Sequence, residues 1–154
     1  MNVPRVSSKN PFLDIREEFN SDKKLYEENV AKVEAKSKVL HAKIIEDFEM
    51  LANHFNELGY EGLDLECLID KSSSYTTIRF RLGGSTFFSI DARIDYESKR
   101  FGEFHLKSKL KIVYEIAYHT TTLKYSSIEE LMESRVFRQD AMRLIKRLEE
   151  LKNK

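Results

Sequence analysis

The sequence is poor in the residues that carry several common kinds of chemistry. It contains one cysteine, two prolines, five glycines and no tryptophan. A single cysteine, Cys67, excludes an intramolecular disulfide and a cysteine zinc cluster. No apolar run approaches the ~18 residues that a membrane span needs, and the first residues, MNVPRVSSKNPF, lack the apolar core of a signal peptide. These absences predict a protein of the reducing cytoplasm that makes no use of a membrane.

Charge is balanced over the whole chain but uneven along it. The 26 lysines and arginines equal the 26 acidic residues, so no net field attracts nucleic acid or an anionic membrane. Residues 72–113 nevertheless carry 8 basic and 4 acidic residues, a net charge of +4, whereas residues 1–71 carry 10 and 15, a net charge of −5. The basic stretch is also the most strand-like part of the chain.

A long helix is expected in the first half. Apolar residues recur every three or four positions over residues 22–58, which places them on one helix face. They are Tyr26, Val30, Val33, Leu40, Ile44, Phe48, Leu51, Phe55 and Leu58. Ser21 is the expected N-cap, and Gly59 is expected to end the helix in the left-handed conformation.

Four strands are expected after this helix, because apolar and polar residues alternate over residues 62–70, 76–82, 88–96 and 104–118. In the central hairpin, a three-residue loop Gly83-Gly84-Ser85 pairs Phe80 with Phe88 and keeps the apolar residues on one face. A two-residue loop would put the two apolar sets on opposite faces. The last strand is long, which predicts a bend or bulge near Ser108.

The remaining residues predict a closing helix, with Ser127 and Glu130 as its capping box. The expected fold class is therefore α+β: a long N-terminal helix, a four-stranded antiparallel meander and a C-terminal helix, with the helices packed on one face of the sheet. Asn10 followed by Pro11 predicts a separate short helical turn. We therefore expect an N-terminal arm over residues 1–20 and a single domain over residues 21–154.

The predicted long helix is longer than the expected diameter of the domain to which it belongs. Residues 22–58 would extend roughly 55 Å, whereas a compact body of this size is about 38 Å across. The N-terminal part of the apolar stripe would then need a cover, unless residues 12–15 fold back over it or the helix bends near Ser37. We expect a non-enzymatic regulator, adaptor or inhibitor that forms a homodimer or binds a protein target. The expected contact residues are Tyr26, Val30, Val33 and Leu40.

Basic side chains at the outward strand positions give an alternative hypothesis, nucleic-acid binding. The residues are Arg79, Arg81, Arg93, Lys107, Lys109 and Lys111. Nucleic-acid-binding sheets combine such cations with aromatic residues that stack on bases. Aromatic residues are few at these positions, and cations on a solvent-facing strand also discourage sheet aggregation. A hydrated surface is therefore the simpler interpretation.

The sequence contains only weak matches to known catalytic motifs. Glu97-Ser98-Lys99, with Asp91 and Asp95 upstream, is similar to the metal-binding E-x-K element of restriction-type nucleases. That element requires a core strand, whereas here it falls in a predicted hairpin turn. A metal-dependent nuclease is therefore the least supported alternative.

The other candidate catalytic groups are isolated. His41 and His54 lie thirteen positions apart on the predicted helix and point in different directions, so they do not share a metal. His119 with Thr121 gives a single H-x-T element where the phosphoesterases that use it need two. Cys67 alternates with inward-facing leucines, which is typical of an unreactive thiol. The sequence predicts no enzyme activity, cofactor, metal or small-molecule substrate.

Overall fold

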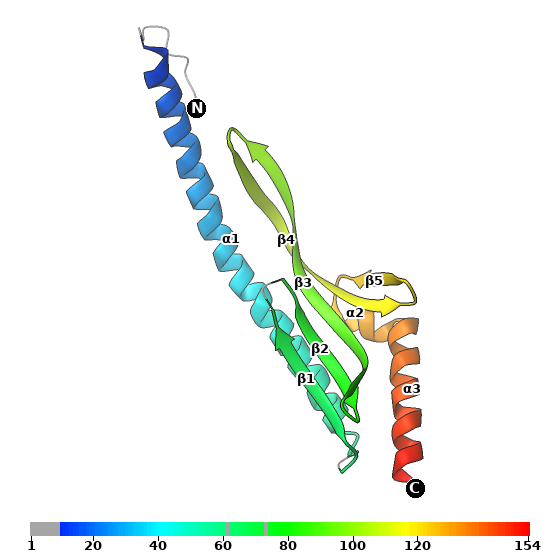
Figure 1. Ribbon diagram of the computed structural model, residues 1–154. Coiled ribbons are helices and arrows are strands. Elements are labelled where there is room, and N and C mark those ends of the chain that lie inside the picture. Colours follow the sequence, from blue (N-terminus) through cyan, green and yellow to red (C-terminus); the bar gives the residue numbers. More distant parts are fainter. Residues whose placement is uncertain (1–9, 61, 73) are drawn as a thin grey trace. The chain divides into compact units, whose positions relative to one another are not determined.

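Helix α1 is the longest element of the chain. In the computed structural model, which describes residues 10–60, 62–72 and 74–154, α1 runs without interruption over Pro11–Asn56 (Figure 1). Asn10 caps it, because its side-chain oxygen accepts a 3.0 Å hydrogen bond from the Phe12 amide. The predicted start at Ser21 is wrong, because Ser21 lies inside the helix. The short turn expected at Pro11 and the long helix expected from residue 22 form one helix, since no proline or glycine lies between them.

The N-terminal arm expected over residues 1–20 is part of α1 where the structure describes it. Residues 1–9 of the expected arm lie outside the described residues, and residues 11–20 belong to α1. Gly59 has a φ of +74°, the left-handed conformation expected after a helix end.

Five antiparallel strands form one sheet in the order β1-β2-β3-β4-β5 (Figure 1). They are β1 (Leu65–Lys71), β2 (Thr76–Leu82), β3 (Ser85–Phe101), β4 (Phe104–Tyr118) and β5 (Thr121–Tyr125). The sequence predicted four strands and missed β5, whose Thr121 pairs with Tyr118 of β4. The intervening turn contains His119 at a φ of +56°, so it lacks the glycine or asparagine that usually marks such a turn.

The β2–β3 hairpin combines a correct register with a wrong loop. Phe80 pairs with Phe88 as predicted, but Leu82 pairs with Ser85, so the loop is the two residues Gly83-Gly84. Both glycines have positive φ, as a two-residue hairpin turn requires. Pairing shifts by one residue after Phe80, which leaves Phe87 as an extra residue in β3. This bulge keeps the apolar residues on one face despite the shorter loop.

Strand β4 contains the irregularity that its length predicted. Lys109, next to Ser108, has a φ of +54°, which is uncommon for a residue with a side chain. Fifteen residues therefore form one strand with a local distortion rather than a regular ladder.

The predicted closing helix is present as two helices, α2 (Ile128–Glu133) and α3 (Arg135–Lys152). The Ser127 hydroxyl accepts from the Glu130 amide at 3.1 Å, as the capping box predicted. Ser134 interrupts the helix because its backbone is extended, and its hydroxyl caps α3 by accepting from the Phe137 amide at 3.2 Å.

The chain divides into two compact units, which we call the hairpin unit and the sheet unit. The hairpin unit holds the chain up to Lys38 with Tyr96–Leu110, and the sheet unit holds Val39–Asp95 with Lys111–Lys154. Elements α1, β3 and β4 contribute residues to both. Among the described residues, no helix combines the length and apolar character that a membrane span requires.

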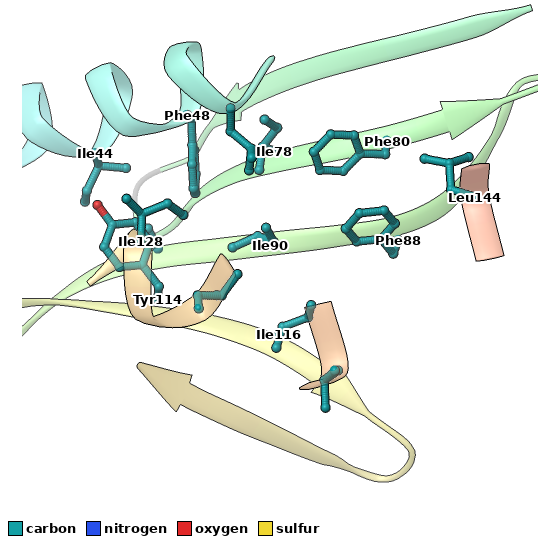
Figure 2. Close-up of a cluster of buried hydrophobic side chains, with 14 of the residues drawn as sticks. Ile44, Phe48, Ile78, Phe80, Phe88, Ile90, Tyr114, Ile116, Ile128 and Leu144 are labelled. Carbon is teal, nitrogen blue, oxygen red and sulfur yellow. The ribbon is translucent and has the colours of Figure 1, made fainter. Parts of the chain in front are cut away.

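The hydrophobic core belongs to the sheet unit and places all three helices on one face of the sheet. Figure 2 shows Ile44 and Phe48 of α1, Ile128 of α2 and Leu144 of α3 facing the apolar side chains of β2, β3 and β4. The strand residues in this core are Ile78, Phe80, Phe88, Ile90, Ala92, Tyr114 and Ile116. This arrangement confirms the α+β fold with one covered sheet face.

Candidate functional site

Within the hairpin unit, the N-terminal half of α1 packs against the hairpin that joins β3 and β4. Tyr26 stacks on Phe104 with ring centroids 4.9 Å apart. Phe19 lies 5.5 Å from the same ring. The apolar stripe of α1 is therefore covered at Tyr26 by the chain's own hairpin, a cover that the sequence did not predict.

Asn29 fixes α1 to strand β4 through two hydrogen bonds. Its amide nitrogen donates to the Lys107 carbonyl at 2.9 Å, and its oxygen accepts from the Lys107 amide at 3.0 Å. Strand β5 pairs only with Tyr114–Tyr118 of β4, so the backbone of Lys107 lies on an open strand edge. The side chain of Asn29 therefore forms the two backbone hydrogen bonds that a neighbouring strand would otherwise form with Lys107.

The hairpin turn reaches α1 at Asp22. Gly102 in this turn has a φ of +60°, and a Cβ atom added there would lie 2.6 Å from a carboxylate oxygen of Asp22. The positive φ favours glycine at this position, and the close approach places the hairpin turn directly beside the Asp22 side chain. The contacts between α1 and the hairpin therefore include Phe19, Asp22, Tyr26 and Asn29.

The first part of α1 has four exposed large apolar side chains, Phe12, Leu13, Ile15 and Phe19, of which Leu13 lies on a different face of the helix from the other three. Phe12, Ile15 and Phe19 are 77%, 59% and 45% exposed. Their spacing of three and four residues places them on one helix face, in line with Tyr26. We call these three residues the exposed seam. The same spacing, continued backwards from Tyr26 across Asp22, is a signal that sequence reasoning could have used.

The predicted contact residues are less accessible than the exposed seam. Tyr26, Val30, Val33 and Leu40 are all half-buried. The alternative in which residues 12–15 fold back over the helix is not observed, because these residues form the first turn of α1. The alternative of a break near Ser37 is not observed either, because α1 continues through this residue. Binding of a protein through the four residues stays a prediction.

Arg93 is held by carboxylates of its own sheet. Its guanidinium donates to Glu115 at 2.7 Å and lies 3.1 Å from Asp95. The hydrogen bond to Glu115 is the main reason that the pKa of Arg93 is raised. Glu115 is buried, so this pair is a structural link between β3 and β4 rather than a free cation.

Most of the other basic positions also have partners in the chain. The contacts are Arg79 with Asp70, Arg81 with the Gly84 carbonyl (2.6 Å), Lys107 over the Tyr96 ring (4.5 Å) and Lys109 with Glu97 (3.2 Å). Of the six basic positions, Lys111 alone makes no such contact with the described residues. A phosphate would have to compete with these internal partners, so the nucleic-acid hypothesis receives no support from side-chain geometry.

The E-x-K element lies on strand β3, and its predicted position in a turn is wrong. Strand β3 continues to Phe101, since it stays paired with β4 beyond the alternating apolar residues. Glu97 contacts Lys109, and Asp91 accepts a 2.5 Å hydrogen bond from the Thr77 hydroxyl. No group of three or more His, Cys, Asp or Glu side chains is placed to hold a metal within residues 10–60, 62–72 and 74–154.

A buried polar contact joins α1 to β4 in the sheet unit. The Tyr114 hydroxyl donates to the carboxylate of Asp47, which also accepts from Lys43 at 2.6 Å. Burial and this hydrogen bond raise the pKa of Tyr114 above its ordinary value. The hydrogen bond to Asp47 likewise raises the pKa of Lys43. Asp47 and Tyr114 are both buried, so the contact has the character of an internal anchor.

The cysteine and the helical histidines are not assembled into a reactive site. Burial raises the pKa of the half-buried Cys67 thiol to about 11, so it is protonated at neutral pH. His54 lies 3.8 Å from Glu57. Nδ1 of His41 is buried and has no hydrogen-bond partner among the described residues.

No protein-family model matches the sequence, and comparison with curated proteins and with solved structures finds no match. Function is therefore inferred from the side-chain geometry of this chain alone.

Proposed function

We propose that the protein is a non-enzymatic interaction protein of the cytoplasm that forms a homodimer through the exposed seam of α1. The observation that carries the proposal is the exposure of Phe12, Ile15 and Phe19 on one helix face. Isolated apolar residues on a surface are ordinary, whereas a contiguous set on one face is typical of an interaction site. A regulator, adaptor or inhibitor could use such a dimer.

The size of the exposed seam suits a helix-mediated contact. From their exposed fractions, the three side chains present roughly 350 Å² of surface, within the ~300–600 Å² range of patches that are often functional. Burying them in two copies contributes about 17 kcal/mol of gross hydrophobic free energy. Association itself costs about 4–15 kcal/mol, so a dimer of moderate affinity is expected.

The spacing within the exposed seam favours antiparallel pairing of two α1 helices. About a two-fold axis near Ile15, Phe12 of one copy lies opposite Phe19 of the other, and Ile15 lies opposite its own equivalent. A second helix can approach here because Phe12 and Ile15 are mostly exposed. Self-complementarity of this kind is the reason for choosing a second copy over a different protein.

Sedimentation velocity of wild type over a range of concentrations tests the proposal. Ile15→Glu places charge at the centre of the contact, so we expect this variant to remain monomeric where wild type dimerises. Val39→Glu is the matched control, because Val39 is also an exposed apolar residue of α1, 68% accessible, but lies off the exposed seam. A wild type that stays monomeric at high concentration, or a dimer that survives Ile15→Glu, would overturn the proposal.

Nucleic-acid binding through the basic positions remains the alternative hypothesis. It predicts retention of nucleic acid that weakens steeply as salt is added. No arrangement of the described side chains favours it over self-association.

A further inference from the structure

An apolar cavity lies within the sheet unit, between the C-terminal part of α1 and helices α2 and α3. Its volume is about 290 Å³. Phe80 of β2 and Phe88 of β3 contribute side chains from the sheet, and Figure 2 shows these two rings side by side near Leu144 of α3. Phe55 of α1 and Phe137 of α3 contribute from the helices.

Four aromatic rings form a continuous row along this cavity. The Phe80 and Phe88 rings are stacked, with centroids 4.5 Å apart and an interplanar angle of 14°. Phe55 meets Phe80 edge-on at 5.1 Å, and Phe137 meets Phe88 edge-on at 6.1 Å. Phe80 and Phe88 are buried and stack on one another, whereas Phe55 and Phe137 are half-buried. The latter two rings offer the surface against which a further aromatic ring can stack or pack edge-on.

The chemistry of the lining restricts the ligand. Among the described residues of the lining, His54 is the one with a side-chain hydrogen-bonding group of the N–H or oxygen type, and its imidazole is largely exposed. Within residues 10–60, 62–72 and 74–154, no lysine, arginine or carboxylate lines the cavity. A charged ligand would lose its hydration without gaining a partner, whereas an apolar ring with one hydrogen-bonding group would lose little.

The volume sets the size of that ligand. An apolar cavity of about 150 Å³ accommodates benzene, and pockets for drug-sized molecules begin near 300 Å³. A cavity of 290 Å³ therefore fits about two fused rings.

We infer that this cavity is a binding site for a small, uncharged, planar aromatic molecule of about two fused rings. The site lies in the sheet unit and does not depend on the proposed dimer, whose contact residues lie in the hairpin unit.

Titration with indole tests the inference. The protein contains no tryptophan, so the emission of added indole can be followed without interference from that residue. Saturable 1:1 binding is expected, with indole emission shifted as it leaves water. Ala141 of α3 lines the cavity, and Ala141→Phe fills it, so at least a tenfold loss of affinity is expected. Ala42→Phe, at an exposed position of α1, is the matched control and should bind indole like wild type.

Three outcomes would overturn the inference: no saturable binding to wild type, affinity retained in Ala141→Phe, or equal losses in both variants. Circular dichroism checks that Ala141→Phe folds, and Ala141→Leu, which adds less volume, replaces it if it does not. Repeating the titration with Ile15→Glu separates the two proposals. If indole binds only to Ile15→Glu, a second copy fills the cavity in wild type and the inference is wrong.

Discussion

The two halves of α1 carry the same kind of apolar stripe but bury it to very different extents. In the sheet unit, Ile44 and Phe48 are fully buried against strands and helices. In the hairpin unit, Tyr26 is covered by one aromatic ring, and Phe12 and Ile15 are mostly exposed. An apolar stripe therefore shows which face of a helix needs a cover, but the cover itself depends on contacts distant in sequence.

The polar anchors of the two halves differ in the same way. Asp47 receives the Tyr114 hydroxyl inside the core, whereas Asn29 binds the Lys107 backbone at an exposed strand edge. A buried hydrogen bond is costly to break because the remaining group stays away from water. An exposed hydrogen bond can be replaced by bonds to water at little cost. We therefore expect the hairpin unit to unfold more easily than the sheet unit.

The largest expected effect contrasts two phenylalanines of α1. Phe48→Ala should lower the free energy of unfolding by about 3–5 kcal/mol, because it leaves a cavity in the core. Phe12→Ala should change it by less than about 0.5 kcal/mol in dilute, monomeric protein, because Phe12 has little burial to lose. Urea unfolding of both variants measures the difference. Similar losses would show that the two halves are buried alike.

An intermediate effect is expected for the buried anchor. Tyr114→Phe leaves the Asp47 carboxylate without its buried donor, at a cost of about 1–3 kcal/mol. The pKa of Tyr114 is raised in the folded state, so its stabilising contribution is fully present below the unfolded pKa near 10 and is lost as pH rises above it. Wild type should therefore lose stability above about pH 10 more steeply than Tyr114→Phe. Parallel pH profiles for the two proteins would contradict this.

The smallest expected effect concerns the exposed anchor. Asn29→Ala should reduce global stability by about 1 kcal/mol or less but should speed hydrogen exchange at the Lys107 amide. Asn53→Ala, at an exposed asparagine of the same helix, is the control and should leave that amide unchanged. If Lys107 exchanges equally in all three proteins, Asn29 does not hold the hairpin on the helix.

Local patterns allowed much of this fold to be predicted. The three-to-four spacing around Phe48 indicated a helix, and the alternation around Phe80 and Phe88 gave the correct pairing. The start of α1 was missed because Ser21 resembles an N-cap, although a helix can continue through serine when nothing breaks it. Strand β5 was missed because its turn at His119 lacks the usual turn residues.

Long-range contacts could not be predicted in this way. The alternation through Phe104 indicates a strand, but nothing local indicates that this ring stacks on Tyr26. The two residues are 78 positions apart in the sequence, as are Asn29 and Lys107, which form the neighbouring hydrogen bonds. The bulge at Phe87 arises because the β2–β3 turn contains two residues instead of the predicted three. The aromatic row at the cavity likewise combines residues of α1, β2, β3 and α3 that no single periodicity relates.

Disulfide trapping tests the proposed use of the exposed seam most directly. In a Cys67→Ala background, Ile15→Cys and Val39→Cys each introduce one thiol at an exposed apolar position of α1. Ile15 lies near the two-fold axis of the proposed dimer, so we predict that Ile15→Cys forms a covalent dimer under mild oxidation much faster than Val39→Cys. Equal rates of cross-linking for the two variants, or none for Ile15→Cys, would contradict self-association through this face.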